Sequence, residues 1–459
     1  MTSSLPAVVI GGGISGLVCA YFLNKAGITT PVLEASQAAG GMIRSERRDG
    51  FLLELGPQSF SGTDGLRALW VELGIADQSL EAPSSAPRYV LIDGALKSVP
   101  LNPPALFTSS LLSLRTKWRL AHDTFGTTRA PEGDESIAAF IRRKFGEELL
   151  DRLVGPFVSG IYAGDPERLS LRSSFTQVYD AEKSAGSVIR GMRRAAKSQK
   201  GSRERPTLLS FRNGNETLIR ALAEKLGSKL RLSAEVLGIA VSREAEKVRF
   251  ELRVRQAGSE ETLIADRLVL ATPAGVAGVL LRDANAAFEP VLGGIEYAPV
   301  AVVSIGYRRE YVAHPLDGFG FLSPRSSGLR VLGSVWNSSL FPERAPPGHV
   351  LLTSFVGGAT DPSAASLSAQ DLTELVHREL APILGIRAAP VFSHTQVYRH
   401  ALPQYNLGHA ERLQALERMC ANLPGLFFVG NYLRGPAVGS CVESGMEVAK
   451  GIASLSRTG

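Results

Sequence analysis

The sequence predicts an α/β domain joined to an α+β part, and three features of the 459-residue chain predict it. An apolar, β-branched run at residues 7–10 leads directly into a glycine-rich turn and then a helical pattern. Apolar runs at 300–305 and 349–355 are typical of a strand-rich domain. Residues 87–205 show mostly helical patterning with an excess of positive charge. The length allows two or three domains, each with its own core.

The composition is that of a globular enzyme, with 44% hydrophobic and 20% charged residues. Cys19, Cys420 and Cys441 lie far apart and outside any C-x-x-C pattern, which predicts buried thiols and neither a disulfide framework nor a metal site. Residues 5–23 carry no charge, but they contain four glycines and no Lys or Arg precedes them. These features argue against a spanning helix or a signal peptide. We therefore expect a soluble or peripheral protein.

The glycine-rich turn has the spacing of a Rossmann-type dinucleotide site, G-x-G-x-x-G at Gly11, Gly13 and Gly16. The first glycine makes the tight turn, the second lets the backbone approach a pyrophosphate, and the third allows close packing of helix on strand. The helix N-terminus then faces the negative charge of the phosphates. A helix ending near Gly27 and a strand at 31–33 deliver Glu34, whose carboxylate suits ribose hydroxyls and repels a 2′-phosphate.

The residues that follow Glu34 indicate which dinucleotide cofactor is bound. Residues 34–45 and the loop at 55–59 resemble the extended signature of the amine oxidase-like flavoprotein superfamily. A returning strand at 267–273 and a strand at 427–431, followed by a helix from about 440 to 455, are similar to the same superfamily. The resemblance implies non-covalent FAD bound by Gly11, Gly12, Gly13, Ile14, Ser15, Gly16, Glu34, Ala35, Gly41, Met42, Arg44, Gly56, Pro57, Gln58, Ser59, Val236, Asn431, Pro436, Ala437 and Val438. Superfamily members often carry an acidic residue where this chain has Asn431.

The domain organisation follows from these segments. The strand expected at 230–236 would bring the backbone of Val236 to the adenine. We predict a discontinuous FAD-binding domain formed by residues 1–86, 206–283 and 418–459. Residues 284–417 are expected to form a mixed-sheet substrate domain, and residues 87–205 a helical membrane-docking insert.

A more specific resemblance covers nearly the whole chain. The segments that carry it are 87–89, 96–100, 135–143, 156–166, 318–322, 341–346 and 355–358. They resemble the protoporphyrinogen oxidase family, FAD enzymes of late haem biosynthesis. The resemblance implies that Gly160 and Ala163 line the catalytic cavity beside the flavin. Gln58 departs from the Asn or Arg expected at its position, so the resemblance gives its side chain no polar role.

The same resemblance assigns four substrate contacts. Arg88 matches the arginine that pairs with a substrate propionate, and Phe355 the aromatic residue that stacks on a pyrrole ring. Leu322 and Val335 match the apolar pair on the opposite face of that ring. Taken alone, Arg88 also fits a surface ion pair, and the three apolar residues fit an ordinary core.

The resemblance implies oxidation of protoporphyrinogen IX to protoporphyrin IX by three two-electron steps, with O2 reduced to H2O2. The main alternative is coproporphyrinogen III oxidation to coproporphyrin III by the same chemistry. More distant alternatives are an amine oxidase or carotenoid desaturase, and a flavin-binding scaffold without turnover. We identify no general base and no nucleophilic triad in the sequence.

The charge distribution suggests a partner surface. Residues 88–205 carry 20 Lys and Arg against 13 Asp and Glu, a net charge of +7 in a chain whose total is +6. Apolar residues beside cations at 105–125, and a basic run from Arg190 to Arg205, favour docking on an anionic membrane. The alternative is a solvated helical face, and no nucleic-acid module accompanies the run. We expect a cytoplasmic protein at the inner face of a bacterial cell membrane, with a homodimer and product transfer to a ferrochelatase as further partner hypotheses.

Overall fold

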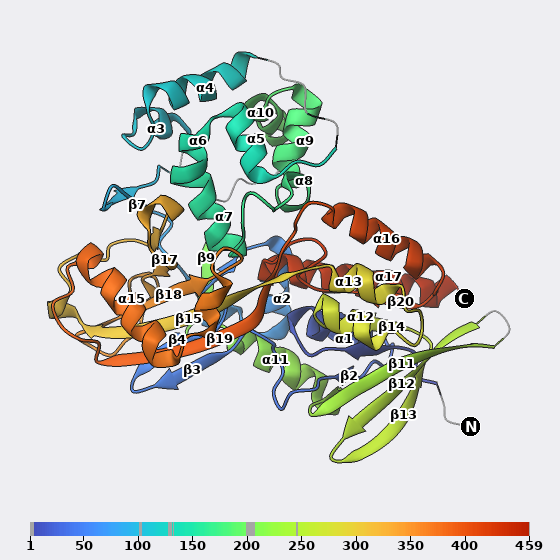
Figure 1. Ribbon diagram of the computed structural model, residues 1–459. Helices are drawn as coiled ribbons and strands as arrows, with labels where there is room; N and C mark the ends of the chain where they lie inside the picture. Colours follow the sequence, from blue (N-terminus) through green and yellow to red (C-terminus); the bar gives the residue numbers. More distant parts are fainter. Residues whose placement is uncertain are drawn as a thin grey trace.

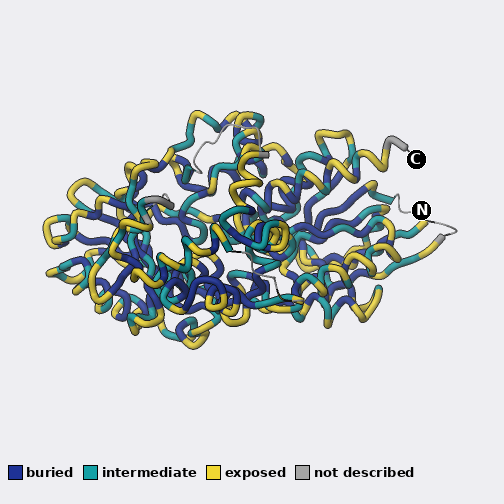
Figure 2. The backbone as a smooth tube through the Cα atoms, turned by 90° about the horizontal axis from the view of Figure 1, so that it is seen from above, coloured by how far each residue is buried: buried dark blue, intermediate teal, exposed yellow. Residues whose placement is uncertain are grey.

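The computed structural model describes residues 4–100, 103–126, 131, 133–198, 207–244 and 247–458. Figure 1 shows a helical part (α3–α10) at the top, a sheet backed by α15 at the lower left, and a parallel sheet with α1 and α17 at the lower right. Seen from above, buried backbone runs through both sheet regions, while the exposed residues lie on the outer turns (Figure 2).

The predicted Rossmann-type core is present as a five-stranded parallel sheet in the order β10-β2-β1-β14-β20. Its strands are β10 (Leu230–Arg231), β2 (Val32–Leu33), β1 (Val8–Ile10), β14 (Leu268–Leu270) and β20 (Leu426–Phe428). Val8 and Val9 face opposite cores, because side chains alternate along a strand. Burial on both faces explains why these strands read as continuous apolar runs.

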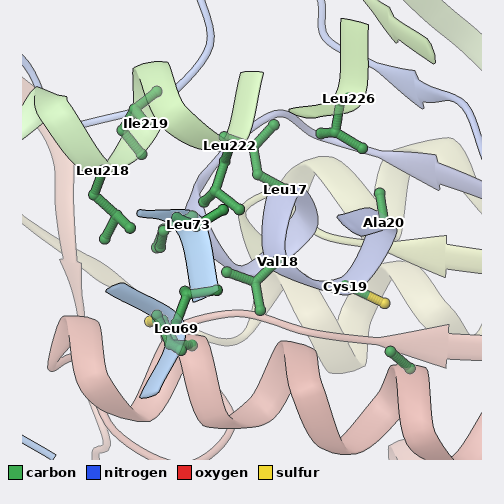
Figure 3. Packing of buried hydrophobic residues seen from close by; sticks show 14 of the residues in the cluster. Leu17, Val18, Cys19, Ala20, Leu69, Leu73, Leu218, Ile219, Leu222 and Leu226 are labelled. Atoms are coloured by element: carbon green, nitrogen blue, oxygen red, sulfur yellow. The ribbon is translucent and has the colours of Figure 1, made fainter. Parts of the chain in front are cut away.

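Helices cover one face of this sheet. They are α1 (Ile14–Lys25), α2 (Asp64–Leu73), α11 (Glu216–Leu226) and α17 (Val438–Thr458). Figure 3 shows Leu17 and Val18 of α1 packed among Leu69, Leu73 and Leu222. The uncharged residues 5–23 thus form the buried strand β1 and most of helix α1. Within the described part of the chain, no helix is long and apolar enough to cross a membrane.

The opposite face carries a second sheet and three helices. The antiparallel sheet consists of β11 (Ala234–Glu244), β12 (Lys247–Gln256) and β13 (Ser259–Ala265), and the helices are α12 (Ala274–Leu280), α13 (Phe288–Gly293) and α16 (His409–Ala421). The prediction of one strand over 230–236 is wrong. The backbone turns at Ser233, whose φ is +52°, so β10 joins the parallel sheet and β11 begins the antiparallel one.

The expected strand-rich domain contains a seven-stranded sheet in the order β19-β15-β18-β17-β16-β7-β8. Its strands are β19 (Phe392–Pro403), β15 (Tyr297–Arg308), β18 (His349–Gly357), β17 (Val331–Val335), β16 (Gly320–Leu322), β7 (Arg88–Ile92) and β8 (Ala95–Ser98). Residues 88–98, predicted as the start of the helical insert, are therefore strands. The helix α15 (Ala369–Leu384) covers one face of this sheet.

The helical part follows β8. Its helices are α3 (Pro103–Thr108), α4 (Leu114–Phe125), α5 (Ile137–Lys144), α6 (Glu147–Leu149), α7 (Gly155–Tyr162), α8 (Leu171–Ser174), α9 (Thr176–Ala185) and α10 (Val188–Ser198). The helical pattern of 105–125 is divided between α3 and α4. A buried Lys144 forms ion pairs of 2.7 Å with Asp123 and 3.1 Å with Glu182, which join α5 to α4 and α9.

Two small sheets lie near the junction of the parts. One pairs β3 (Ser45–Arg48) with β4 (Phe51–Glu54), and the other is β5-β9-β6, formed by β5 (Phe60–Ser61), β9 (Leu208–Phe211) and β6 (Ser79–Glu81). The short helix α14 (Asn337–Leu340) follows β17 and completes this junction.

Candidate active site

The glycine-rich turn between β1 and α1 has the geometry that its spacing predicts. Gly11 has a φ of +107°, and a Cβ there would lie 2.8 Å from the carbonyl carbon of Ala271. A Cβ on Gly16 would lie 2.1 Å from the carbonyl oxygen of Gly11. No side chain fits at either position, because each glycine lies directly against neighbouring backbone.

Gly13 differs from these two glycines, since a Cβ placed on it would meet no atom within 4 Å. Its backbone is extended, with a φ of −71°, so the conformation itself does not require glycine. The open space lies at the N-terminus of α1, where a diphosphate would accept hydrogen bonds from free backbone N–H groups. The residues of the turn therefore fit the phosphates of a dinucleotide.

Glu34 lies at the end of β2, beside this turn. Its Oε2 accepts a hydrogen bond of 2.6 Å from the backbone N–H of Gly12, and its Oε1 accepts one of 2.9 Å from Ser36. The side chain is half-buried, and a carboxylate has about four acceptor sites. Glu34 thus keeps acceptor capacity toward ribose hydroxyls. The backbone N–H of Ala234 donates to the carbonyl of Glu34 at 2.9 Å, which brings the start of β11, with Val236, to this end of the site.

The segment after Glu34 returns to the turn. Gly40 donates to the carbonyl of Gly12 at 2.7 Å, and Gly13 and Gly40 form a parallel bridge. Gly41 and Arg44 are exposed, and Met42 between them is half-buried. Gly40 and Gly41 therefore lie against Gly12 and Gly13 of the first turn.

The loop at 55–59 packs on that segment. A Cβ on Gly56 would lie 2.0 Å from the carbonyl oxygen of Met42, so the two backbones are in direct contact. Gln58, to which the resemblance gave no polar role, is buried and donates to the carbonyls of Glu54 and Gly56 at 2.9 and 2.8 Å. Its amide shapes the loop that contains it.

The C-terminal segment completes the predicted cofactor site. Gly430 and Gly435 have φ values of +152° and +143°, and they bracket the turn that contains Asn431. The helix α17 then begins at Val438, two residues before the predicted start, with Pro436 and Ala437 directly before it. Its N-terminus is positive through the helix dipole, which favours a neighbouring negative charge.

The four predicted substrate residues share one face of the seven-stranded sheet. Gly320 pairs with both Arg88 and Val335, whereas Gly333 pairs with both Leu322 and Phe355. Paired residues point to the same face, and so do residues two apart along a strand. The opposite face of the sheet packs on α15, so this face is turned toward the helical part.

Helix α7 lies against that face. A Cβ on Gly160 would come within 2.6 Å of Leu322 Cδ2, so the glycine allows the close contact. A π-helical turn over Leu150–Val154 precedes α7, and Ala163 ends the helix with a φ of +47°. The carbonyl of Ala163 accepts a hydrogen bond of 2.7 Å from Ala359, two residues beyond β18. Gly160 and Ala163 thus both lie beside the strands that carry the substrate residues.

Arg88 is exposed, and its guanidinium lies 5.8 Å from the ring centroid of Phe319. Within the described residues no carboxylate pairs with it. This observation disfavours the surface ion pair that the sequence left open as an alternative. The charge stays available to an anionic group on this face.

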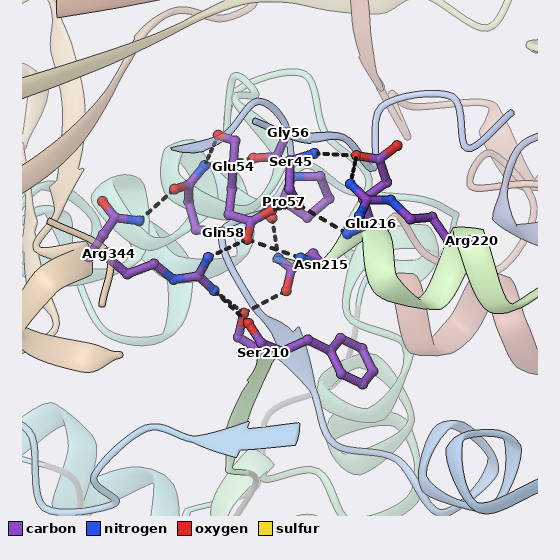
Figure 4. A network of polar contacts seen from close by, with 12 residues as sticks. Ser45, Glu54, Gly56, Pro57, Gln58, Ser210, Asn215, Glu216, Arg220 and Arg344 are labelled. Atoms are coloured by element: carbon purple, nitrogen blue, oxygen red, sulfur yellow. Dashed lines mark hydrogen bonds and ion pairs between the residues drawn. The ribbon is translucent and has the colours of Figure 1, made fainter. Parts of the chain in front are cut away.

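Sequence reasoning missed several residues that border the site. Tyr398 of β19 packs in the same cluster as Phe355, and burial raises the pKa of its hydroxyl while the charge of Arg44 lowers it. The hydroxyl of Tyr405 donates to the carbonyl of Asn431. Glu54 and Arg344 form a buried ion pair beside the 55–59 loop (Figure 4). Their partners lie far away in the sequence, so no local spacing reveals them.

Comparisons with known proteins identify the family of the chain. The family model of flavin-containing amine oxidoreductases matches residues 14–453. The chain belongs to this family. Members contain a flavin, and the cofactor of this oxidoreductase is FAD.

Relatives within the family are more specific. The chain is 36% identical to a chloroplastic protoporphyrinogen oxidase of Nicotiana tabacum, over 97% of this chain and 85% of the relative. It is 28% identical to the coproporphyrinogen III oxidase of Bacillus subtilis, over 95% of this chain and 96% of the relative. A crystal structure of a candidate protoporphyrinogen oxidase from an Exiguobacterium species superposes with a TM-score of 0.82 at 27% identity, covering 99% of this chain and all of that one.

A structure of lower sequence identity shares the fold alone. A putrescine oxidase variant superposes with a TM-score of 0.70 at 19% identity, covering 98% of each chain. The same fold therefore occurs in enzymes with different names and substrates, and the substrate has to be argued from the residues of the site.

Replacing Gly13 by Val should yield a folded protein without bound FAD. A Cβ at this position meets no atom within 4 Å, so we expect folding to be preserved while the side chain fills the space of the diphosphate. Flavin absorbance per mole of protein, with circular dichroism as the test of folding, measures the effect. Gly451→Val is a matched control, since a Cβ on this α17 residue also meets no atom within 4 Å. Stoichiometric FAD in the Gly13→Val protein would contradict the assignment.

Proposed function

We propose that this enzyme oxidises protoporphyrinogen IX to protoporphyrin IX in haem biosynthesis, by three two-electron steps with O2 as the electron acceptor and H2O2 as the product. One observation carries the proposal. Arg88, Leu322, Val335 and Phe355 share the sheet face that lies against α7, in a chain 36% identical to a protoporphyrinogen oxidase over almost its whole length.

The proposed substrate suits the chemistry of this face. A porphyrinogen is a large apolar macrocycle with anionic propionates, so it needs apolar walls and a cation at one edge. On α7, Phe157 and Ile161 are 47% and 41% exposed, and they share a helical face with Gly160. Together with Leu322 and Phe355 they supply apolar surface for the walls of the proposed binding site. FAD supplies the redox chemistry, and the chain supplies binding and orientation.

Arg88 is the proposed anchor for a propionate. Bringing a carboxylate against an apolar wall is costly unless a charged hydrogen-bonding partner is present. A guanidinium binds a carboxylate with two hydrogen bonds and stays protonated at every working pH. Arg88 lies in the strand next to the one that carries Leu322, so one contact fixes the register of the macrocycle along the sheet.

A second candidate substrate is coproporphyrinogen III, which carries four propionates. The relative from Bacillus subtilis, a coproporphyrinogen III oxidase, favours it. Steady-state assays of both porphyrinogens, followed by porphyrin fluorescence, decide between them. The preferred substrate is the one with the higher kcat/KM.

Arg88→Ala should lower kcat/KM for the porphyrinogen by roughly ten- to a hundredfold, because a hydrogen bond to a charged group contributes about 1.5–3 kcal/mol. FAD content and folding should stay unchanged, since Arg88 is exposed and forms no ion pair with the described residues. Arg88→Lys should recover part of the loss. Arg308→Ala, at the exposed end of β15 in the same sheet, is the control.

The porphyrinogen with esterified propionates separates anchoring from general damage. It cannot accept the charge-assisted bond, so the wild type and Arg88→Ala should turn it over at similar rates. An equally large difference between the two proteins on the ester would show that Arg88 is not the anchor.

We also propose that the helical part docks the enzyme on an anionic membrane. On α4, Leu114, Trp118 and Phe125 are 83%, 66% and 85% exposed. On α10, Met192 is 46% exposed, next to the exposed Arg193. Exposed apolar and cationic side chains on the same helices are typical of an interfacial surface. Lys200, Arg203 and Arg205 of the predicted basic run lie outside the described residues.

The two helices are joined, which supports a single docking surface. Asp123 of α4 accepts hydrogen bonds of 3.1 Å from the hydroxyl of Ser187 and from the backbone N–H of Ile189 at the start of α10. In a bacterium, docking would hold this cytoplasmic enzyme at the inner face of the cell membrane. A poorly soluble product could then pass to a ferrochelatase. On the basis of the family resemblance, we also propose that the enzyme forms a homodimer.

Binding to anionic vesicles should exceed binding to neutral ones and should weaken with salt, because exposed charges are screened beyond about 8 Å at physiological ionic strength. Replacing Arg193 and Arg194 by Ser should weaken binding by roughly tenfold or more, at about 1 kcal/mol for each basic residue near the surface. Vesicle co-sedimentation measures both effects. Val71→Ser is the control, since Val71 is 70% exposed on α2, outside the helical part. Equal binding to neutral and anionic vesicles would contradict the proposal.

A further inference from the structure

A buried ion pair joins two distant parts of the chain at the edge of the cofactor site. The guanidinium of Arg344 lies 2.8 Å from Glu54 Oε1, and both side chains are 1% exposed. Replacing a buried pair by apolar residues of similar size is often neutral or stabilising. Stability alone therefore does not explain why the chain contains this buried pair. The groups that the pair holds in place indicate its role.

The carboxylate of Glu54 is the centre of a network drawn in Figure 4. It accepts a hydrogen bond of 2.6 Å from the hydroxyl of Ser45 and one of 3.0 Å from the backbone N–H of Asn215. The side chain of Asn215 then donates to the carbonyl of Pro57 at 2.8 Å. Arg344 donates to Ser210, whose hydroxyl donates to Asn215 Oδ1 at 2.7 Å. The ion pair thus fixes the amide that holds the 55–59 loop.

A second chain of contacts reaches the loop from the substrate sheet. Gln58 donates to the carbonyls of Glu54 and Gly56, and its Oε1 accepts a hydrogen bond of 2.7 Å from Asn337 Nδ2. Asn337 begins α14, two residues after Val335, which ends β17. Its own Oδ1 is buried without a hydrogen-bond partner among the described residues. The surroundings of Oδ1 would favour an apolar side chain. The hydrogen bond from Nδ2 to Gln58 is therefore the interaction that the Asn337 amide contributes.

These contacts link the 55–59 loop of the predicted cofactor site to the strand that carries Val335. The carbonyls of Glu54, Gly56 and Pro57 are all held by buried amides, and Gly56 lies against Met42 of the predicted cofactor segment. At the other end lies the strand with Val335, on the proposed substrate face. Small errors in the placement of two reacting groups are costly to rate.

We propose that Glu54 and Arg344, acting through Asn215, Gln58 and Asn337, form a positioning network. It sets the spacing between the 55–59 loop of the predicted cofactor site and the proposed substrate face of the sheet. The proposal rests on the proposed function for the identity of the substrate. None of Glu54, Arg344, Asn215 and Asn337 belongs to the predicted site. They act on the reaction through the loop and the strand that they hold.

The double substitution Glu54→Leu with Arg344→Met tests the network. It removes both charges together, so no unpaired charge is left buried and the fold is retained. FAD content should stay stoichiometric, kcat should fall by roughly ten- to a hundredfold, and KM should change much less. The visible absorption band of the bound flavin should shift, because the loop beside it is released. A merely structural role would change the melting temperature without altering kcat or the spectrum.

A matched control is available in the helical part. Lys144 and Asp123 form an ion pair of 2.7 Å with side-chain exposures of 2% and 4%, similar to those of the network pair. Lys144→Met with Asp123→Asn removes both charges, and an oxygen remains to accept from Ser187 and Ile189. Glu182, the second partner of Lys144, keeps its ion pair of 2.9 Å with Arg143. This variant should lose stability without any change in kcat or in the flavin spectrum.

Asn337→Leu is the decisive variant if the double substitution does not fold. It leaves the ion pair intact and removes only the bond to Gln58, so kcat should again fall while the melting temperature stays within a few degrees. Wild-type kcat and an unchanged flavin spectrum in either folded variant would overturn the network. A wild-type protein that oxidises no porphyrinogen would instead overturn the proposed function, and the flavin spectra of the variants would still test the network.

Discussion

The carboxylate of Glu54 and the guanidinium of Arg344 meet at 2.8 Å, almost without exposure, where β4 ends beside the segment that follows α14. Burial raises the pKa of Glu54 to about 7 and lowers that of Arg344, so each charge depends on the other and on the hydrogen bonds around it. Separating the two segments would leave a charge buried alone, at a cost of about 3–5 kcal/mol. The ion pair therefore joins the end of β4, in the FAD-binding part, to the segment after α14, in the part that contains the proposed substrate face.

The sequence predicted what short-range spacing determines. The order of β1, the glycine turn, α1 and β2 follows from residues 7–34, because each step depends on its immediate neighbours. Strand 230–236 was predicted wrongly, since the turn at Ser233 uses a positive φ without glycine. Residues 88–98 form a hairpin in which Ile92 pairs with Ala95 across a turn at Asp93 and Gly94, whose φ values are +53° and +76°. Asp-Gly between two runs with apolar residues is a local hairpin signal that the prediction of a helical insert overlooked. The pairing of Arg88 with Gly320, more than two hundred positions away, is the part that leaves no local signal.

The substrate residues illustrate both sides of this division. Arg88, Leu322, Val335 and Phe355 were assigned from a family resemblance, and only the strand registers show that they share one face. Their periodicity alone fits an ordinary core. Glu54, Arg344 and Asn337 were missed, because a single polar residue at the end of an apolar run has many explanations. The fold is shared with enzymes that act on amines, so the substrate follows from this face and from the relatives.

Anaerobic mixing of the oxidised FAD enzyme with protoporphyrinogen IX tests the central claim most directly. Without O2 each FAD can accept only one of the three electron pairs that the substrate has to lose. The visible flavin absorption should therefore disappear rapidly, and porphyrin fluorescence should rise only when O2 is admitted and the remaining two steps can follow. Coproporphyrinogen III in a parallel experiment ranks the two candidate substrates, and a primary amine such as putrescine should leave the flavin oxidised. A flavin that stays oxidised with both porphyrinogens would contradict the account.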